Sequence, residues 1–176
     1  MTLLEVLDSA VKIGLGALIA GVSALLLSRS QHRRELDRAR IDREFQLLKD
    51  VAEQTERFTQ ASLRHWALST DAHRARRLKK PMTERKVLNL AESNDTLFNI
   101  FHELTSSEAK LLLLGNRDAQ QALRVYGEMV IAFRRSAMSD SETMSDAEID
   151  TWRANILKTR ERLLDELHRC YRQLGS

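Results

Sequence analysis

Residues 46–75 read QLLKDVAEQTERFTQASLRHWALSTDAHRA. Apolar or small side chains recur here at alternating steps of three and four, the period of one face of an α-helix. They are Leu47, Val51, Phe58, Ala61, Leu68, Ala72 and Ala75. A second stripe beside the first consists of Ile41, Phe45, Leu48, Ala52 and Thr55. Two adjacent stripes predict a helix that contacts more than one partner helix.

The boundaries of this helix follow from its flanks. Neither glycine nor proline occurs between Gly21 and Pro81, so one helix can extend to about Lys79 before Pro81 ends it. His65 occupies a place in the first stripe and is interpreted as a partly buried histidine of the core. We therefore expect a long helix over residues 29–80.

Further helices are predicted in residues 81–176. Thr83 is the expected cap of the next helix, and Thr105 with Glu108 predicts a capping box before a short apolar turn that Gly115 ends. Asn116 is the expected start of another helix, and Ser145 with Glu148 forms the clearest capping box, at the start of the last. The polar stretch SDSETM, residues 139–144, is interpreted as a loop.

Each of these helices has an apolar stripe. The stripes consist of Val87, Leu90, Ala91, Leu97, Phe98, Phe101 and Leu104; of Ala119, Leu123, Tyr126, Val130 and Phe133; and of Ile149, Trp152, Ile156, Leu163, Leu167, Tyr171 and Leu174. No stretch alternates like a strand. Amphipathic helices of this length bury their facing stripes in an antiparallel bundle, so the sequence predicts an all-α fold.

The composition supports this class. Hydrophobic residues make up 43% and charged residues 30% of the 176, which argues against disorder, and one proline with six glycines is too few for a turn-rich β fold. Cys170 is the only cysteine, which excludes an internal disulfide and a multi-thiolate metal site. No metal, cofactor or small-molecule substrate is predicted.

The segment IGLGALIAGVSALLLS, residues 13–28, contains no charged side chain. Extended upstream to Ala10 it admits only Lys12, and its roughly 19 residues span about 28 Å as a helix, enough for the hydrocarbon core of a bilayer. The positive charges follow this segment, whereas a cleaved signal peptide has them in front. We therefore expect a transmembrane helix over residues 10–28.

Its orientation follows from the flanking charges. Glu5, Asp8 and Lys12 precede the segment, whereas six arginines follow it between Arg29 and Arg43. Arginines resist translocation, so residues 1–9 should lie outside and the body from residue 29 onward in the cytoplasm, at a bacterial inner membrane. Lipid is the implied partner.

Small residues lie along one side of this predicted anchor. Gly16, Ala20 and Ala24 recur at steps of four, with Ala17 and Gly21 beside them. Small side chains let two membrane helices approach closely. This pattern predicts self-association and a homo-oligomer.

The search for catalytic motifs finds one arrangement. Arg162 and His168 enclose five residues in RLLDELH. This resembles the arginine–histidine signature of HEPN ribonucleases, which are small helical bundles that cleave RNA without metal where two protomers meet. The residue after the arginine is usually polar in that family and is Leu163 here. The resemblance implies Arg162 and His168 as candidate catalytic residues of a metal-independent ribonuclease, the enzymatic alternative.

A basic segment, HRARRLKKPMTERK, lies at residues 73–86. Its cations are Arg74, Arg76, Arg77, Lys79, Lys80, Arg85 and Lys86. Such density can neutralise the phosphates of nucleic acid or the carboxylates of an acidic protein. The competing interpretation is a solvated turn whose cations are favourable at the end of a helix.

The architecture resembles that of small bacterial single-pass membrane proteins with a helical cytosolic bundle similar to a degenerate HEPN bundle, among them accessory effectors of CRISPR and antiphage defence. The resemblance rests on IGLGALIAG and the following HRRELDRARIDRE. It implies a non-enzymatic, homo-oligomeric structural or effector protein, with membrane-pore formation as one mode of action. The alternatives are a tethered nucleic-acid-binding protein and a monomeric scaffold that docks a cytosolic partner.

Overall fold

The computed structural model describes residues 3–138 and 144–174, with side chains for residue 31, residues 34–138 and residues 144–174. These residues form four helices and no strand: α1 (Leu3–Arg77), α2 (Glu84–Leu113), α3 (Arg117–Ala137) and α4 (Asp146–Leu174). The predicted all-α class is therefore confirmed. Most of the predicted loop, residues 139–143, lies outside the described residues.

The chain divides into two compact units, Met1–Arg43 and Glu44–Ser176. In the first unit the backbone is helical from Leu3, and the side chains that the structure describes there are all exposed. Among the residues described with side chains, no helix is long and apolar enough to span a bilayer. The predicted span 10–28, with the seam of Gly16, Ala17, Ala20, Gly21 and Ala24, lies outside those residues.

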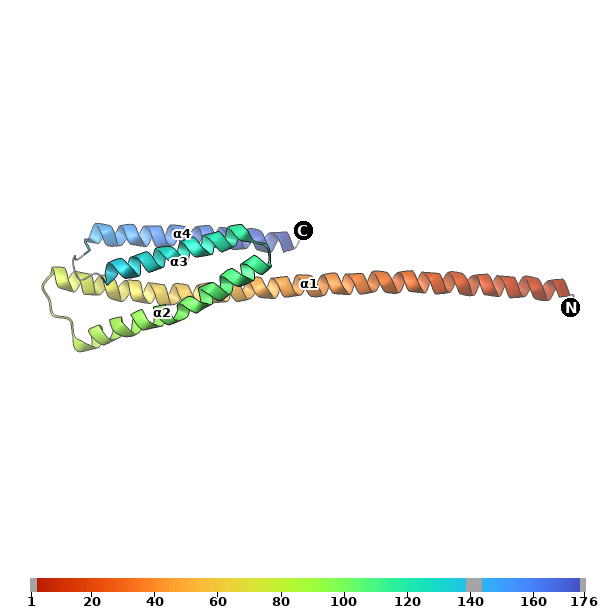
Figure 1. Cartoon of the computed structure of the whole chain (residues 1–176), viewed down its shortest axis with the longest axis horizontal. Coiled ribbons are helices and arrows are strands. Elements are labelled where there is room, and N and C mark those ends of the chain that lie inside the picture. The colour runs from red at the N-terminus through yellow and green to blue at the C-terminus, as the bar shows by residue number, and fades with distance from the viewer. Residues whose placement is uncertain (1–2, 139–143, 175–176) are drawn as a thin grey trace. The chain divides into compact units, whose positions relative to one another are not determined.

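The second unit is a helical bundle whose helices follow one another in antiparallel order (Figure 1). Three contacts between α1 and α2 define this direction: Lys110 bonds Asp50 at 3.1 Å, Arg57 bonds Glu103 at 2.9 Å, and Arg64 bonds Glu92 at 3.3 Å. As the residue numbers rise along α1, those of the α2 residues that it contacts fall, so the two helices are antiparallel. Short connections between successive helices produce this arrangement.

The core is centred on α3. All five residues of its predicted stripe, from Ala119 to Phe133, are at most 1% exposed. Around them lie Phe58 of α1, Leu97 of α2 and Leu163 of α4, each with no exposed surface. Phe58 packs edge-on against the Tyr126 ring with centroids 5.6 Å apart. The interdigitation of these rings and leucines fixes the helices of the bundle against one another.

The buried face of α1 differs from the predicted stripes. The predicted residues that are buried are Leu48, Val51, Thr55, Phe58, His65 and Ala72. The face also contains four hydroxyl groups and a second histidine that neither stripe included: Thr59, Ser62, Ser69, Thr70 and His73. Short side chains that bond their own helix, as Thr59 does to the carbonyl of Thr55, let neighbouring helices approach closely.

Two predictions about α2 are wrong. Thr105 and Glu108 do not open a new helix, because α2 continues unbroken from Glu84 to Leu113 and no glycine or proline interrupts its ladder of backbone bonds. Val87 and Phe98, placed on the buried stripe, are 52% and 64% exposed. Leu97 and Leu104 of the predicted stripe are buried, and the face that packs inward also contains Ser93, Ser107 and Leu111.

The ends of the helices follow the predicted signals more closely. Ser145 and Glu148 form the expected capping box: the Ser145 amide donates to Glu148 Oε2 at 2.7 Å, and the Glu148 amide donates to Ser145 Oγ at 3.2 Å. Thr83 and Asn116 are N-cap residues, as predicted by position, although neither side chain makes a capping bond. At the far end of α1, Lys79 adopts φ of 51°, and at the end of α2, Gly115 adopts φ of 74°.

Candidate functional site

Arg162 and His168 both lie on the exposed surface of α4. Six positions separate them, which places the two side chains about 120° apart around the helix axis. The intervening residues that face the core are Leu163 on one turn and Leu167 on the next. Within one chain the structure therefore does not bring the two candidate catalytic residues into a common cleft.

The basic segment is partly neutralised by carboxylates. Arg74 and Arg77 both donate to Asp146 Oδ1, at 3.2 and 2.6 Å, which ties the end of α1 to the start of α4. These bonds hold the pKa of Asp146 below its usual range. Lys86 approaches Asp71 at 3.8 Å. Part of the charge predicted for an external acidic partner is therefore engaged in holding helices together, while Lys79, Lys80 and Arg85 remain exposed.

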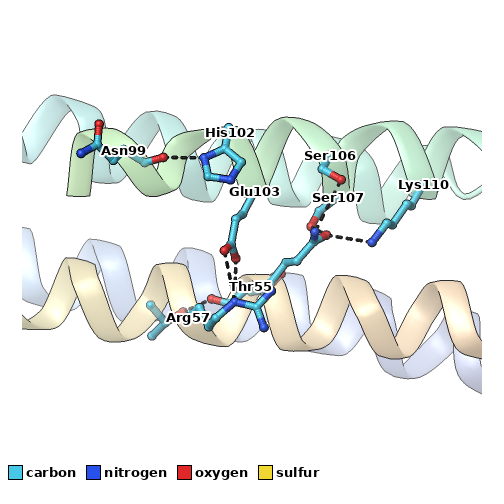
Figure 2. Close-up of polar contacts among 10 residues, drawn as sticks. Thr55, Arg57, Asn99, His102, Glu103, Ser106, Ser107 and Lys110 are labelled. Carbon is cyan, nitrogen blue, oxygen red and sulfur yellow. Dashed lines mark hydrogen bonds and ion pairs between the residues drawn. The ribbon is translucent and has the colours of Figure 1, made fainter. Parts of the chain in front are cut away.

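A polar seam joins α1 to α2 (Figure 2). Gln54 Oε1 accepts from Ser107 Oγ at 2.8 Å and from Lys110 Nζ at 3.2 Å. One turn further along α1, the Arg57 guanidinium donates to both oxygens of Glu103, at 3.2 and 2.9 Å. These contacts give the helix pair its register.

Two buried histidines lie further along α1. The Ser93 hydroxyl donates to the carbonyl of Leu90, so it accepts from Nδ1 of His65 at 3.2 Å, and Nε2 of His65 accepts from Ser69 at 3.3 Å. Burial, with a smaller contribution from the charge of Arg134, lowers the pKa of His65 to about 4. The interpretation of His65 as a core histidine is confirmed, since it is 1% exposed.

His73 connects α1 to both sides of the α3–α4 connection. Its Nε2 donates to the carbonyl of Ala137 at 3.1 Å, and its Nδ1 accepts from the Met144 amide at 3.3 Å. The bond that Nδ1 accepts requires the neutral ring with its proton on Nε2. Burial lowers the pKa of His73, which favours that form.

The seam between α1 and α4 is more open. A cavity of about 330 Å³ lies between α1, α3 and α4, with Leu63, Trp66, Ile156 and Leu157 among its lining residues. The Trp66 indole nitrogen is buried and has no hydrogen-bond partner in the part of the chain that the structure describes. At the mouth, the Arg153 guanidinium lies 5.6 Å from the centre of the Trp66 ring.

Exposed apolar side chains continue along this seam. We define the α1/α4 face by five of them: Phe45 (44% exposed), Leu63 (47%), Leu157 (44%), Leu164 (43%) and Tyr171 (55%). The rings of Phe45 and Tyr171 contact each other in a tilted arrangement, with centroids 5.8 Å apart. Tyr171, predicted on the buried stripe of α4, thus lies on this face, and Cys170 is the residue buried in its place.

Sequence reasoning missed the α1/α4 face, although a signal was present. Leu157, Leu164 and Tyr171 recur every seven residues, one position after the buried series Ile156, Leu163 and Cys170. A seven-residue repeat of this kind is typical of a helix that packs along a second helix. The α1/α4 face is therefore the candidate functional surface of the bundle.

In the described residues, no group of three or more histidine, cysteine, aspartate or glutamate side chains is arranged to hold a metal ion. No family model, no curated protein and no solved structure matches the chain.

Proposed function

We propose that this protein is a membrane-anchored, non-enzymatic assembly protein, in which several copies associate and display their helical bundles on the cytoplasmic side of a bacterial inner membrane. The observation that carries the proposal is the α1/α4 face. Five large apolar side chains on one side of a bundle, each more than two-fifths exposed, are typical of a protein–protein contact surface.

The sequence supports the membrane part of the proposal. Residues 13–28 contain no charge, and arginines cluster only on the side that is expected to remain in the cytoplasm. The small residues Gly16, Ala20 and Ala24 supply a second contact, between anchors. One contact between bundles and one between anchors can together link more than two copies.

The first experiment is the mass of the full-length protein in detergent, measured by size-exclusion chromatography with light scattering. A discrete oligomer supports the proposal, and a mass beyond a dimer justifies ion-flux measurements in liposomes. A monomer at every concentration and in every detergent would contradict it.

A second experiment tests the anchor separately. The Gly16→Leu/Ala20→Leu variant should lose the contact between anchors, because two leucines keep the helices apart, while circular dichroism shows an unchanged helix content. Carbonate-washed membranes should retain the wild-type protein. Release of the protein into the carbonate wash would contradict the membrane anchor.

A further inference from the structure

The α1/α4 face is built in levels. At one end lies an aromatic level, Phe45 with Tyr171. Next comes a charged level, in which Arg160 bonds Glu56 at 3.3 Å. A leucine level follows, where Leu63 and Leu157 line the same cavity. Each level contains one side chain from α1 and one from α4. From one level to the next the residue numbers rise along α1 and fall along α4, because the two helices are antiparallel.

We propose that the occupant of this face is a second copy of the chain, related by a two-fold axis that runs parallel to α1 and α4. The proposal rests on the proposed function, since it locates one of the contacts through which copies assemble. It assigns the bundle an isologous interface, in which α1 of one protomer lies opposite α4 of its partner.

The charged level favours a second copy. Rotation about an axis parallel to the helices keeps every level at its own height and exchanges α1 with α4. Glu56 of one copy then faces the partner's Arg160, and both side chains are accessible, at 53% and 33%. The aromatic level of one copy likewise lies opposite the aromatic level of its partner, and the leucine level lies opposite the partner's leucine level. The surface is therefore complementary to itself in both charge and apolarity.

The same level excludes the other two-fold arrangement. An axis perpendicular to the helices within the face would place α1 opposite the partner's α1 and reverse the order of the levels. With this axis at the charged level, Glu56 would face its own copy, as would Arg160, and with the axis at another height the charged level would lie opposite an apolar one. Like charges placed opposite one another in a contact are unfavourable.

The cavity beside Leu63 and Leu157 also favours contact with a partner at the leucine level. Leu63 and Leu157 border an apolar space of about 330 Å³ that opens on this face. Contact with the partner's leucines removes water from its mouth and buries side chains that are 47% and 44% exposed in one copy.

Light scattering of full-length protein in detergent, with the Gly16→Leu/Ala20→Leu background to remove the anchor contact, measures the bundle contact alone. We expect a dimer in this background and a monomer after Leu157→Glu or Leu63→Glu. Leu113→Glu is the matched control, since Leu113 is 80% exposed on α2, away from the face, and this variant should remain dimeric.

Charge reversal tests the interface with variants at exposed side chains, which leave the buried core of the bundle unchanged. Arg160→Glu should halve the mass, because two carboxylates then lie at the charged level of each copy. The double variant Glu56→Arg/Arg160→Glu restores one charge of each sign and should restore the dimer. Recovery in the double variant attributes the loss in the single variant to the charges at this level and not to the shape of the substituted side chain.

Disulfide trapping tests the direction of the axis. In a Cys170→Ala background, copies with Leu63→Cys are mixed with differently tagged copies with Leu157→Cys and oxidised. The proposed axis predicts a mixed disulfide between the two tags. Disulfides only between identical copies would overturn it in favour of the perpendicular arrangement.

The outcomes separate the two proposals. A wild-type protein that is monomeric contradicts the proposed function and the interface together. A wild-type oligomer whose Gly16→Leu/Ala20→Leu form keeps its mass when the leucine and charge substitutions are added overturns the interface alone, and the α1/α4 face then has a different occupant. A wild-type oligomer whose Gly16→Leu/Ala20→Leu form is a dimer that the face variants dissociate and Leu113→Glu does not supports both.

Discussion

Helix α3 packs into the core mainly through apolar side chains, whereas the part of α1 that runs through the bundle combines a few apolar side chains, such as Phe58, with a larger number of hydroxyl groups and two histidines. Every residue of the α3 stripe from Ala119 to Phe133 is almost fully buried and hydrophobic. On α1 the equivalent face contains Thr59, Ser62, His65 and Ser69. Burial of apolar area stabilises directly, whereas a hydrogen bond formed on folding replaces one made to water and contributes about 1 kcal/mol. The two helices therefore stabilise the same bundle in different ways: α3 by the amount of surface it buries, α1 by the register its bonds impose.

The largest effect should come from α3. Phe133→Ala removes a ring that packs against His65 and Trp152, and a cavity of this kind costs about 3–5 kcal/mol. Ser62→Ala on α1 should cost about 1 kcal/mol, because the change removes one small hydroxyl that bonds the carbonyl of Phe58 in its own helix and leaves no large cavity. Urea denaturation followed by circular dichroism measures both. Equal losses would contradict the contrast between the helices. Phe98→Ala is the control for ring removal at an exposed site.

The second effect is a pH dependence located on α1. The folded pKa of His65 is lowered to about 4, so as pH falls below 6.5 the unfolded chain takes up a proton that the folded chain does not. The contribution of His65 to the free energy of unfolding is fully present above pH 6.5 and is lost progressively toward pH 4. The total loss is up to about 3 kcal/mol. His73, whose pKa is also lowered, adds a loss of the same sign.

Urea midpoints at pH 7.5 and pH 5 measure this loss. His65→Gln should reduce the difference between the two midpoints, since the amide can bond Ser93 without titrating. His168→Gln, at an exposed histidine of α4, is the matched control and should leave the difference as it is in the wild type. A difference that persists undiminished in His65→Gln would show that the buried imidazole is not its source.

A smaller effect is expected from the unsatisfied hydroxyls of α1. Thr70 Oγ1 is buried and finds no hydrogen-bond partner among the described residues. Thr70→Val keeps the shape and removes the unpaired group, so we expect a stabilisation of about 1 kcal/mol. Thr59→Val should be destabilising instead, because Thr59 Oγ1 bonds the Tyr126 hydroxyl at 2.9 Å. Opposite shifts of the urea midpoint are the expected result, and shifts of the same sign would contradict it.

The smallest effect concerns the ends of helices. Lys79 and Gly115 occupy the same left-handed position after α1 and α2, each followed by an amide that bonds a carbonyl five residues back. Lys79→Gly should stabilise by about 0.5–1 kcal/mol, and Gly115→Ala should destabilise by a similar amount, since only glycine adopts this conformation without strain. Space is not the cause at Gly115, where an added Cβ meets nothing within 4 Å. Thermal midpoints of the two variants should move in opposite directions.

The contrast between α3 and α1 also explains what could be predicted from the sequence. The α3 stripe is regular and apolar, so periodicity identified five of its buried residues, from Ala119 to Phe133, and missed Gln120, Ala122 and Gly127 beside them. The Ser145–Glu148 box is a local signal that needs no tertiary partner. Serine and threonine are neutral in a hydrophobic pattern, so the buried face of α1 could not be read from it. Val87 and Phe98 were misplaced because α2 has more apolar residues than one buried face accepts. Thr105 and Glu108 have the spacing of a cap, but a cap acts only where the backbone ladder is already broken.

The candidate surface was less accessible to sequence reasoning. The basic segment was found by its density, but the bonds from Arg74 and Arg77 to Asp146 depend on how α4 docks beside α1. The α1/α4 face depends on the register between two helices more than a hundred residues apart along the chain, as the Glu56–Arg160 pair illustrates. Local patterns do not encode that register.

Cys170 gives the molecule a built-in reporter. Its thiol is buried, and burial, with the nearby carboxylates of Glu166 and Asp118, raises its pKa, so a maleimide or disulfide reagent reaches a reactive thiolate only when the end of α4 detaches. Because the chain has one cysteine, the labelling rate reports this opening event at one site alone. In any assembly that holds the end of α4 in place, the labelling rate of Cys170 should fall as the protein concentration rises.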